Sequence, residues 1–242
     1  MCFWPSKPSA AGRPPLSAAH KPIVCYVTDR KALGSADSVV NLRGKIRLAI
    51  RAGADWIQIR EKDLSGRELL ALTRDAVASA NQSVTQVSGA RVYVNDRLDV
   101  ALAAGAAGVH LGGESLSAKD VIRWCRAGNA PADFEIGVSC HSIDDAREAE
   151  RGGASYVFFG PVFDTPSKRG FGPPQGISTL AEVCGAIEIP VIAIGGVSEK
   201  NARECVEAGA AGIAAIRMFQ DAQSAEDLAD SVARIHALKI TR

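Results

Sequence analysis

The stretch PVIAIGGVSEKNARECVEAGAAGIAAI, residues 190–216, decides the fold because it contains one whole strand–helix–strand unit. Two apolar runs, Pro190–Ile194 and Gly212–Ile216, flank a longer amphipathic segment. The first run is apolar at consecutive positions, which is typical of a parallel strand that is covered on both faces. The turn AGAAG at 208–212 supplies a glycine that can end the helix in the left-handed conformation just before the next strand.

The same unit recurs along the chain. Short apolar runs alternate with longer amphipathic segments, and similar glycine-containing turns stand at 52–55, 104–108 and 152–154. The predicted strands are Ile23–Thr28, Trp56–Arg60, Arg91–Val94, Gly108–Leu111, Glu135–Ser139, Tyr156–Pro161, Pro190–Ile194 and Gly212–Ile216. Eight such units close a barrel, so we expect an α/β fold, a (β/α)8 TIM barrel in a single domain.

The length of 242 residues suits one barrel domain, which we place at 23–242. Residues 1–22 are rich in proline, serine and alanine and lack hydrophobic periodicity. This composition predicts a disordered N-terminal extension. It holds no apolar core of a signal peptide, whereas an organelle transit peptide remains an alternative.

Composition limits the classes of partner. The chain has 28 Lys and Arg against 27 Asp and Glu, so no overall field attracts nucleic acid or an acidic membrane. No apolar run reaches the roughly 18–20 residues that span a bilayer. Six cysteines without a CxxC pair fit reduced thiols. We therefore expect a soluble cytoplasmic protein that binds small molecules; its oligomeric state, a homo-oligomer included, is left open.

Polar residues gather where the predicted strands end, which is where catalytic groups of such barrels lie. In QIREKD, residues 58–63, the alternation of an extended chain places Gln58, Arg60 and Lys62 on one side. Two cations and an amide suit a polyphosphate, since Arg offers a bidentate fork and Lys a point charge. The alternative is a solvated, charged loop.

The third predicted strand is followed by Asn95 and Asp96. Asp96 is a candidate Mg²⁺ ligand, because Mg²⁺ takes few protein carboxylates and completes its shell with phosphate and water. Alternatively, either residue caps the helix that begins there.

Two later loops are candidates for phosphate binding. The sequence GGVS at 195–198 leads into a helix and leaves backbone N–H groups that can hold a phosphate monoester. The loop at 160–168 adds Thr165, Ser167 and Lys168. With the glycines and prolines that follow, it is typical of an active-site loop that closes over substrate.

His110 and His141 stand at the ends of the fourth and fifth predicted strands. Either could exchange protons at the barrel mouth or form a hydrogen-bonded structural imidazole. Cys140 precedes His141, but successive strand residues point to opposite faces, so we interpret Cys140 as a buried structural thiol.

Taken in order, seven motifs of this chain resemble those of the thiamine phosphate synthase family, over almost the whole sequence after residue 22. They are YVTD at 26–29, QIREK at 58–62, VNDR at 94–97, GVHLG at 108–112, GVS at 137–139, GPVF at 160–163 with Thr165 and Lys168, and AIGGV at 193–197. The resemblance implies a transferase that joins 4-amino-2-methyl-5-(diphosphomethyl)pyrimidine to thiazole phosphate, with Mg²⁺ assisting the departure of pyrophosphate.

The resemblance also implies residue roles. Lys168, Ser139 and Arg60 are the expected catalytic residues, with Lys168 at the departing pyrophosphate and Ser139 near the pyrimidine. Asp96 would bind Mg²⁺. The remaining expected contacts are Gln58, Arg60, Lys62 and Asn95 with the diphosphate-bearing pyrimidine, and Thr165, Ser167 and Gly196 with the thiazole phosphate.

Two positions depart from the family pattern. Ser115 stands where the family commonly has a second acidic Mg²⁺ ligand, and a neutral hydroxyl binds Mg²⁺ more weakly unless Glu114 substitutes for it. Arg217 stands where the family usually has a serine near phosphate, and it could still contact that anion.

These departures keep two alternatives open. The sequence SCHS at 139–142 resembles the TenI-like thiazole tautomerases, in which His141 would be the acid or base. That sister family generally loses the diphosphate-binding residues, which this chain retains, so we favour the synthase. A barrel that binds thiamine precursors without catalysis would show tight binding and no turnover. Whether the free or the carboxylated thiazole phosphate is used is left open.

Overall fold

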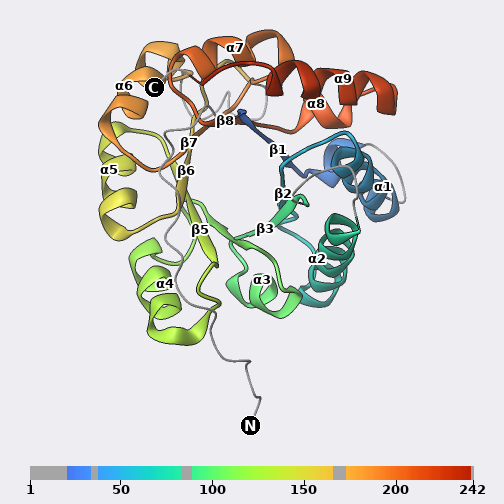
Figure 1. Cartoon of the computed structure of the whole chain (residues 1–242). Coiled ribbons are helices and arrows are strands. Elements are labelled where there is room, and N and C mark those ends of the chain that lie inside the picture. The colour runs from blue at the N-terminus through green and yellow to red at the C-terminus, as the bar shows by residue number, and fades with distance from the viewer. Residues whose placement is uncertain (1–20, 34–37, 83–88, 166–172, 241–242) are drawn as a thin grey trace.

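The computed structural model describes residues 21–33, 38–82, 89–165 and 173–240. Eight parallel strands follow one another around a closed barrel, and β8 pairs with β1 to complete it. Helices surround the strands on the outside (Figure 1). The predicted TIM barrel is therefore confirmed, whereas the predicted N-terminal extension at 1–22 lies outside the described residues except for Lys21 and Pro22.

The strands begin at or within one residue of the predicted positions and end within two of them. Their bounds are β1 Ile23–Val27, β2 Trp56–Ile59, β3 Arg91–Asn95, β4 Gly108–Leu111, β5 Glu135–Cys140, β6 Tyr156–Phe159, β7 Val191–Ile194 and β8 Gly212–Ala215. The helices are η1 Arg30–Leu33, α1 Ser38–Arg51, α2 Gly66–Asn81, α3 Leu98–Ala104, α4 Ala118–Trp124, η2 Cys125–Asn129, α5 Ile143–Gly152, α6 Gly176–Ala186, α7 Glu199–Glu207, α8 Arg217–Gln220 and α9 Ala225–His236.

The side chains of the strands form two separate apolar cores, one inside the barrel and one between the strands and the helices. Aromatic rings fill the inner core: Trp56 packs against Tyr93 and Tyr156, with ring centroids 4.9 and 4.7 Å apart. The interior below the mouth is thus packed rather than hollow. Polar side chains that enter the barrel can reach a ligand only at the carboxyl ends of the strands.

Glycine turns make the short connections that the sequence predicted. Gly105 and Gly153 follow α3 and α5 with φ of 66° and 92°, in the left-handed region where residues with a side chain are strained. Each reverses the chain directly into the next strand, which starts within three residues.

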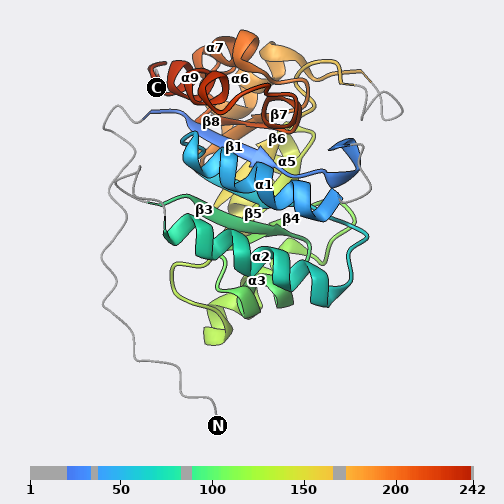
Figure 2. The same ribbon diagram turned by 90° about the vertical axis from the view of Figure 1, so that its right-hand side faces the viewer.

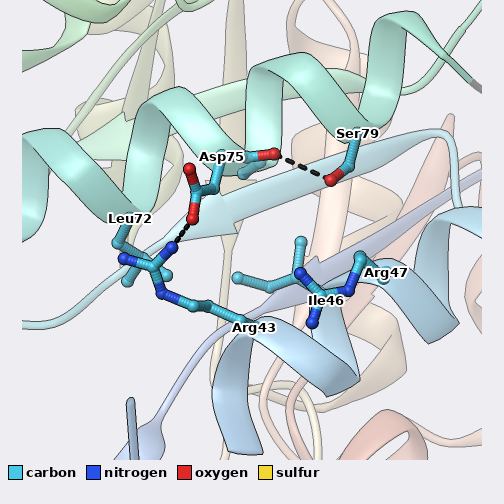
Figure 3. A pocket seen from close by; sticks show the side chains of 7 residues that line it. Arg43, Ile46, Arg47, Leu72, Asp75 and Ser79 are labelled. Atoms are coloured by element: carbon cyan, nitrogen blue, oxygen red, sulfur yellow. Dashed lines mark hydrogen bonds and ion pairs between the residues drawn. The ribbon is translucent and has the colours of Figure 1, made fainter. Parts of the chain in front are cut away.

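Helices α1 and α2 lie side by side outside the first strands (Figure 2). Arg43 of α1 pairs with Asp75 of α2, and the apolar side chains of Ile46 and Leu72 lie beside this pair (Figure 3). The small hollow between them is lined by helix residues only, so it belongs to the packing of the outer layer.

A polar cluster ties the last helix to the amino-terminal end of the barrel. Asp55 accepts hydrogen bonds from Lys21, from His236 of α9 and from the N–H of Val24 in β1, at 2.8, 2.7 and 2.9 Å. Burial opposes the ionisation of Asp55, but the hydrogen bonds from His236 and Lys21 outweigh it and lower its pKa. In the described ranges, no helix has both the length and the apolar character needed to cross a bilayer.

Candidate functional site

Gln58 and Arg60 lie at the carboxyl end of β2, where a buried strand opens into the barrel mouth. The side chain of Gln58 is buried and that of Arg60 is partly exposed. The extended segment is shorter than predicted: β2 ends at Ile59, and Lys62 lies exposed in a turn. The predicted alternation therefore holds for Gln58 and Arg60, whereas a turn sets the position of Lys62.

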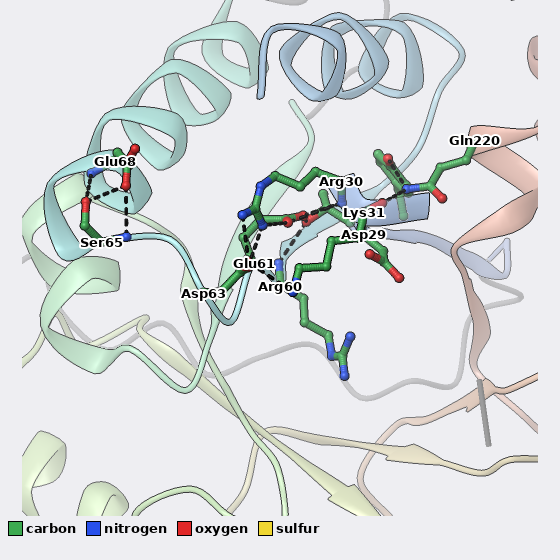
Figure 4. A network of polar contacts seen from close by, with 11 residues as sticks. Asp29, Arg30, Lys31, Arg60, Glu61, Asp63, Ser65, Glu68 and Gln220 are labelled. Atoms are coloured by element: carbon green, nitrogen blue, oxygen red, sulfur yellow. Dashed lines mark hydrogen bonds and ion pairs between the residues drawn. The ribbon is translucent and has the colours of Figure 1, made fainter. Parts of the chain in front are cut away.

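A hydrogen-bonded clamp fixes the backbone at Arg60. The hydroxyl of Thr28 accepts the Arg60 N–H at 2.9 Å and donates to the buried carboxylate of Glu61 at 2.7 Å. Arg30 donates to that carboxylate from its backbone N–H and from its guanidinium, at 3.2 and 3.1 Å. Since Glu61 turns into this clamp, Arg60 projects from the other side of the chain, away from the network (Figure 4).

Asp63 extends the clamp at the surface. Arg30 also donates to Asp63 at 2.6 Å, and Lys31 pairs with it at 3.0 Å. The hydrogen bond from Arg30 is the main cause of a pKa of Asp63 well below its usual range. Sequence reasoning missed Thr28, Arg30 and Glu61 as functional residues, although the alternation in QIREKD already places Glu61 opposite Arg60.

A chain of side-chain hydrogen bonds joins β2 to β3. Gln58 Nε2 donates to Asn95 Oδ1 at 3.1 Å, and Asn95 Nδ2 donates to Asp96 Oδ2 at 2.5 Å. The carboxylate of Asp96 can only accept, which orients both amides and leaves Oε1 of Gln58 buried with no hydrogen-bond partner among the described residues. A buried acceptor without a partner is what a donor group of a ligand would satisfy.

Asp96 has a φ of 63°, which is uncommon for a residue with a side chain and is a form of strain found at functional sites. The next helix, α3, begins at Leu98 with Arg97 as its N-cap, and no side chain caps it. The alternative that Asn95 or Asp96 caps the helix is therefore wrong. Both side chains are instead part of the network at the mouth.

The structure brings the two predicted metal ligands together. The hydroxyl of Ser115 donates a short hydrogen bond to Asp96 Oδ1 and accepts the N–H of Gly112 at 2.6 Å. Glu114 is exposed. The described ranges contain no cluster of three or more His, Cys, Asp or Glu side chains that could hold a metal ion. A divalent ion here would have one carboxylate and a serine, so it would need phosphate and water oxygens as well, as Mg²⁺ accepts.

His110 lies inside the barrel below these groups. Its Nε2 is 2.9 Å from the Ser139 hydroxyl, and its Nδ1 is 3.4 Å from the Tyr156 hydroxyl. Burial lowers the pKa of His110 to about 3; the charge of Asp96 opposes this shift and that of Arg60 adds to it. His110 is therefore a neutral, hydrogen-bonded imidazole at physiological pH. This favours a structural imidazole over a histidine that exchanges protons.

His141 follows β5 and is exposed. Its Nδ1 is 2.5 Å from the carbonyl oxygen of Gly160, which can only accept, so the neutral ring has its lone pair on Nε2. Cys140 before it is fully buried against the outer helices, and burial raises its pKa to about 12. The interpretation of Cys140 as a buried thiol holds.

The loops after β6 and β7 are paired backbone to backbone. Val162 and Phe163 donate to the carbonyls of Ile194 and Gly195, each at 2.9 Å. Gly196 has a φ of 67°, and a Cβ there would lie 2.6 Å from the carbonyl oxygen of Asp164. Only glycine fits at this position.

Within the described ranges, the N–H groups of Gly196 and Val197 make no hydrogen bond. They directly precede Ser198, the N-cap of α7. This arrangement suits a phosphate. Thr165 of the facing loop is partly exposed, whereas the predicted residues Ser167 and Lys168 lie outside the described residues.

Arg217 is exposed at the start of α8, directly after β8. It lines an open hollow of about 550 Å³ together with Ser198 and Lys200. Arg217 thus lies near Ser198, the residue that follows the glycine loop.

A profile of the family described as thiamine monophosphate synthase matches residues 24–219 of the chain. Thiamine-phosphate synthase of Roseiflexus castenholzii is 39% identical over 209 residues, which cover 86% of each chain. That of Chlorobium luteolum is 38% identical over 220 residues, 91% of this chain and 95% of its relative.

A solved structure extends the likeness to three dimensions. Thiamine phosphate pyrophosphorylase from Pyrococcus furiosus superposes with a TM-score of 0.75 and 30% identity, over 90% of this chain and 96% of that one. Sequence profile, relatives and fold agree over nearly the whole barrel, and this chain belongs to the thiamine monophosphate synthase family.

Proposed function

We propose that this chain is a thiamine phosphate synthase. It couples 4-amino-2-methyl-5-(diphosphomethyl)pyrimidine with thiazole phosphate, or its carboxylate, to give thiamine phosphate and pyrophosphate. The names of its relatives support this activity. The observation that carries it is the network of Gln58, Asn95 and Asp96 beside Arg60 at one side of the mouth.

The pyrimidine is assigned to Gln58 and Ser139. The buried Oε1 of Gln58 accepts no hydrogen bond from the described part of the chain, and the exocyclic amine of an aminopyrimidine is a donor that would satisfy it. Ser139 is partly exposed and offers its hydroxyl from β5. Held between them, the ring would keep a fixed orientation while its methylene group reacts.

The diphosphate is assigned to Arg60 and Lys62, with Lys168 as a further cation. Arg60 has no hydrogen bond or ion pair from its side chain to any described residue, and its backbone is held by the clamp of Thr28 and Glu61. A cation in a fixed position stabilises negative charge as it develops on the leaving pyrophosphate.

Asp96 and Ser115 would hold Mg²⁺, and the adjacent carboxylate and hydroxyl fit that ion when substrate phosphates complete its shell. A bound Mg²⁺ would supply charge neutralisation for the pyrophosphate group. Asn95 keeps the Asp96 carboxylate in place through its amide.

The thiazole phosphate is assigned to the N–H groups at Gly196 and Val197, and Thr165, Ser167 and Arg217 are the side chains proposed to bind it with them. Fixed there, the thiazole nitrogen donates its lone pair to the methylene carbon of the pyrimidine. The bond from that carbon to the diphosphate oxygen breaks, and its electrons leave with pyrophosphate. Cleavage of this C–O bond comes first, the electron-rich aminopyrimidine stabilises the cationic methylene that results, and the thiazole nitrogen then captures it.

His141 supports a second candidate, thiazole tautomerisation. Its Nδ1 faces the carbonyl of Gly160, so Nε2 can accept a proton. The diphosphate-binding residues have no use in that reaction, which is why we place it second. We assign the protein to the cytoplasm; the buried thiols of Cys25, Cys125, Cys140 and Cys205 suit a reducing compartment.

The test is a magnesium-dependent coupling assay with both phosphorylated precursors, in which thiamine phosphate and pyrophosphate are followed together. Equal formation of both products supports the synthase, and Ser115→Asp measures whether the serine limits the use of Mg²⁺. No product, together with tautomerisation of the thiazole carboxylate phosphate that His141→Ala abolishes, would replace the synthase by the tautomerase. Tight binding of the precursors with neither activity would show that the protein binds thiamine precursors without catalysis.

A further inference from the structure

A row of three hydrogen-bonding side chains runs upward through the barrel interior to the mouth. Tyr156 of β6 contacts His110 of β4, which in turn contacts Ser139 of β5. The imidazole is held from the side by Phe158, whose ring centroid is 4.3 Å away. Tyr156 and His110 are each 1% exposed, whereas Ser139 reaches the mouth. The row therefore links a sealed interior to the ligand.

The hydrogen atoms in this row can be placed from the inventory of donors and acceptors. In the described part of the chain, His110 Nδ1 is the one hydrogen-bond partner of the Tyr156 hydroxyl. A buried phenol donates its hydrogen where an acceptor is in reach. A neutral imidazole that accepts at Nδ1 has its proton on Nε2, and this N–H then donates to Ser139 Oγ at 2.9 Å.

We propose that His110 is a positioning residue, which Tyr156 holds in the tautomer protonated at Nε2, so that Ser139 presents its O–H to the ligand. Because Oγ of Ser139 is occupied by the imidazole N–H, its own hydrogen points away from His110. The site would then select a ring nitrogen that lacks a proton and discriminate against a ring with N–H at that place. The assignment of that ligand atom rests on the proposed function; the tautomer does not.

Tyr93 provides a matched control in the same inner core. It is also a buried phenol, 1% exposed, and its ring meets that of Tyr156 edge to face at 5.5 Å. Its hydroxyl donates to Glu135 at 2.5 Å, and Arg91 pairs with the same carboxylate. Tyr93→Phe and Tyr156→Phe each delete one buried oxygen, but only the second removes a partner of His110.

The direct test is a long-range ¹H–¹⁵N correlation spectrum of the full chain with ¹⁵N-labelled histidine and no ligand, which shows which ring nitrogen has the proton. His110 is assigned by the loss of its signals in His110→Gln or, should that variant unfold, by elimination after His20→Gln, His141→Gln and His236→Gln have assigned the other three histidines. We expect Nε2–H in the wild type and in Tyr93→Phe, and a mixture of tautomers in Tyr156→Phe. A wild-type imidazole protonated at Nδ1, or no response to Tyr156→Phe, would overturn the proposal.

The second readout is the coupling assay. Loss of one neutral hydrogen bond predicts a roughly 3- to 10-fold fall in kcat/KM for the pyrimidine diphosphate in Tyr156→Phe, with the KM for thiazole phosphate unchanged. Tyr93→Phe should stay within about twofold, and urea unfolding checks that both variants are folded. Equal falls in both variants would mean a purely structural role. A wild type that makes no thiamine phosphate would refute the proposed function and leave the spectrum to decide the tautomer.

Discussion

Side chains form the half of the mouth that β2, β3 and β4 contribute, whereas backbone N–H groups form the half at the end of β7. In the first half, Gln58, Asn95 and Asp96 orient one another through hydrogen bonds. In the second, the backbone N–H groups of Gly196 and Val197 make no hydrogen bond within the described residues. The difference suggests that the first half recognises the shape and charge of a particular group, and the second recognises a phosphate whatever it is attached to.

The largest effect is expected from Asp96→Ala, which removes the carboxylate at the centre of the first half. We predict that synthase kcat/KM falls about 10²–10³-fold, because the charge of the leaving pyrophosphate is no longer compensated. Near-ultraviolet circular dichroism should show an intact fold. Activity within about threefold of wild type, in a folded variant, would remove Asp96 from the assignment.

Gly196→Ala is the corresponding change in the second half. The new Cβ would meet the Asp164 carbonyl at 2.6 Å, so the loop must move and the KM for thiazole phosphate should rise roughly 10-fold or more. Gly105→Ala is the control, because Gly105 has nearly the same φ, 66° against 67°, but nothing within 4 Å of the added atom. Both substitutions carry a backbone penalty of about 1–2 kcal/mol, and at Gly196 the clash adds to it, so the KM and not the stability identifies a ligand site. Equal KM values would contradict a ligand site at Gly196.

Glu61→Gln tests the clamp that holds the first half. The variant keeps a hydrogen bond from Thr28 but loses the charge that Arg30 faces, and we expect about 1–3 kcal/mol of lost unfolding free energy. A 3- to 10-fold fall in kcat/KM for the pyrimidine diphosphate should accompany it, measured with thiazole phosphate saturating. Asp63→Asn is the control, because Asp63 pairs with the same Arg30 at the surface. This variant should leave the unfolding free energy and kcat/KM nearly unchanged. If Glu61→Gln and Asp63→Asn lower kcat/KM equally, the clamp has no part in positioning Arg60.

The smallest effect is expected at the other end of the barrel. Asp55→Asn should remove about 1–2 kcal/mol of unfolding free energy at neutral pH and leave both KM values unchanged. The folded pKa of Asp55 lies below its unfolded value, so its contribution is complete above roughly pH 4 and is lost as the pH falls through the folded pKa. Urea titrations of both proteins at several pH values measure this. The account would be contradicted if the difference in unfolding free energy between wild type and Asp55→Asn grew as the pH fell.

The sequence was sufficient for the barrel because its signals are local. Apolar runs, amphipathic segments and glycine turns such as that at Gly105 each act within a few residues, and the closed topology follows from their number. The strand ends had to converge once the barrel closed, so the meeting of Gln58, Asn95 and Asp96 could be predicted too.

The partners across the barrel could not be predicted in this way. Thr28 reaches Glu61 over 33 residues, and Tyr156 reaches His110 over 46. Alternation tells to which side a strand residue points, but the pairing depends on strand register and side-chain length. Lys62 shows the limit of alternation itself, because β2 ended earlier than the charged run indicated.

Calorimetric titration of each substrate, separately, into wild type, Asp96→Asn and Gly196→Ala tests the division of the mouth most directly. The pyrimidine diphosphate is titrated with Mg²⁺, and the thiazole phosphate without it. We predict that Asp96→Asn loses affinity for the pyrimidine diphosphate alone, and Gly196→Ala for the thiazole phosphate alone. A folded variant that loses both ligands, or the opposite one, would contradict the assignment of the two halves.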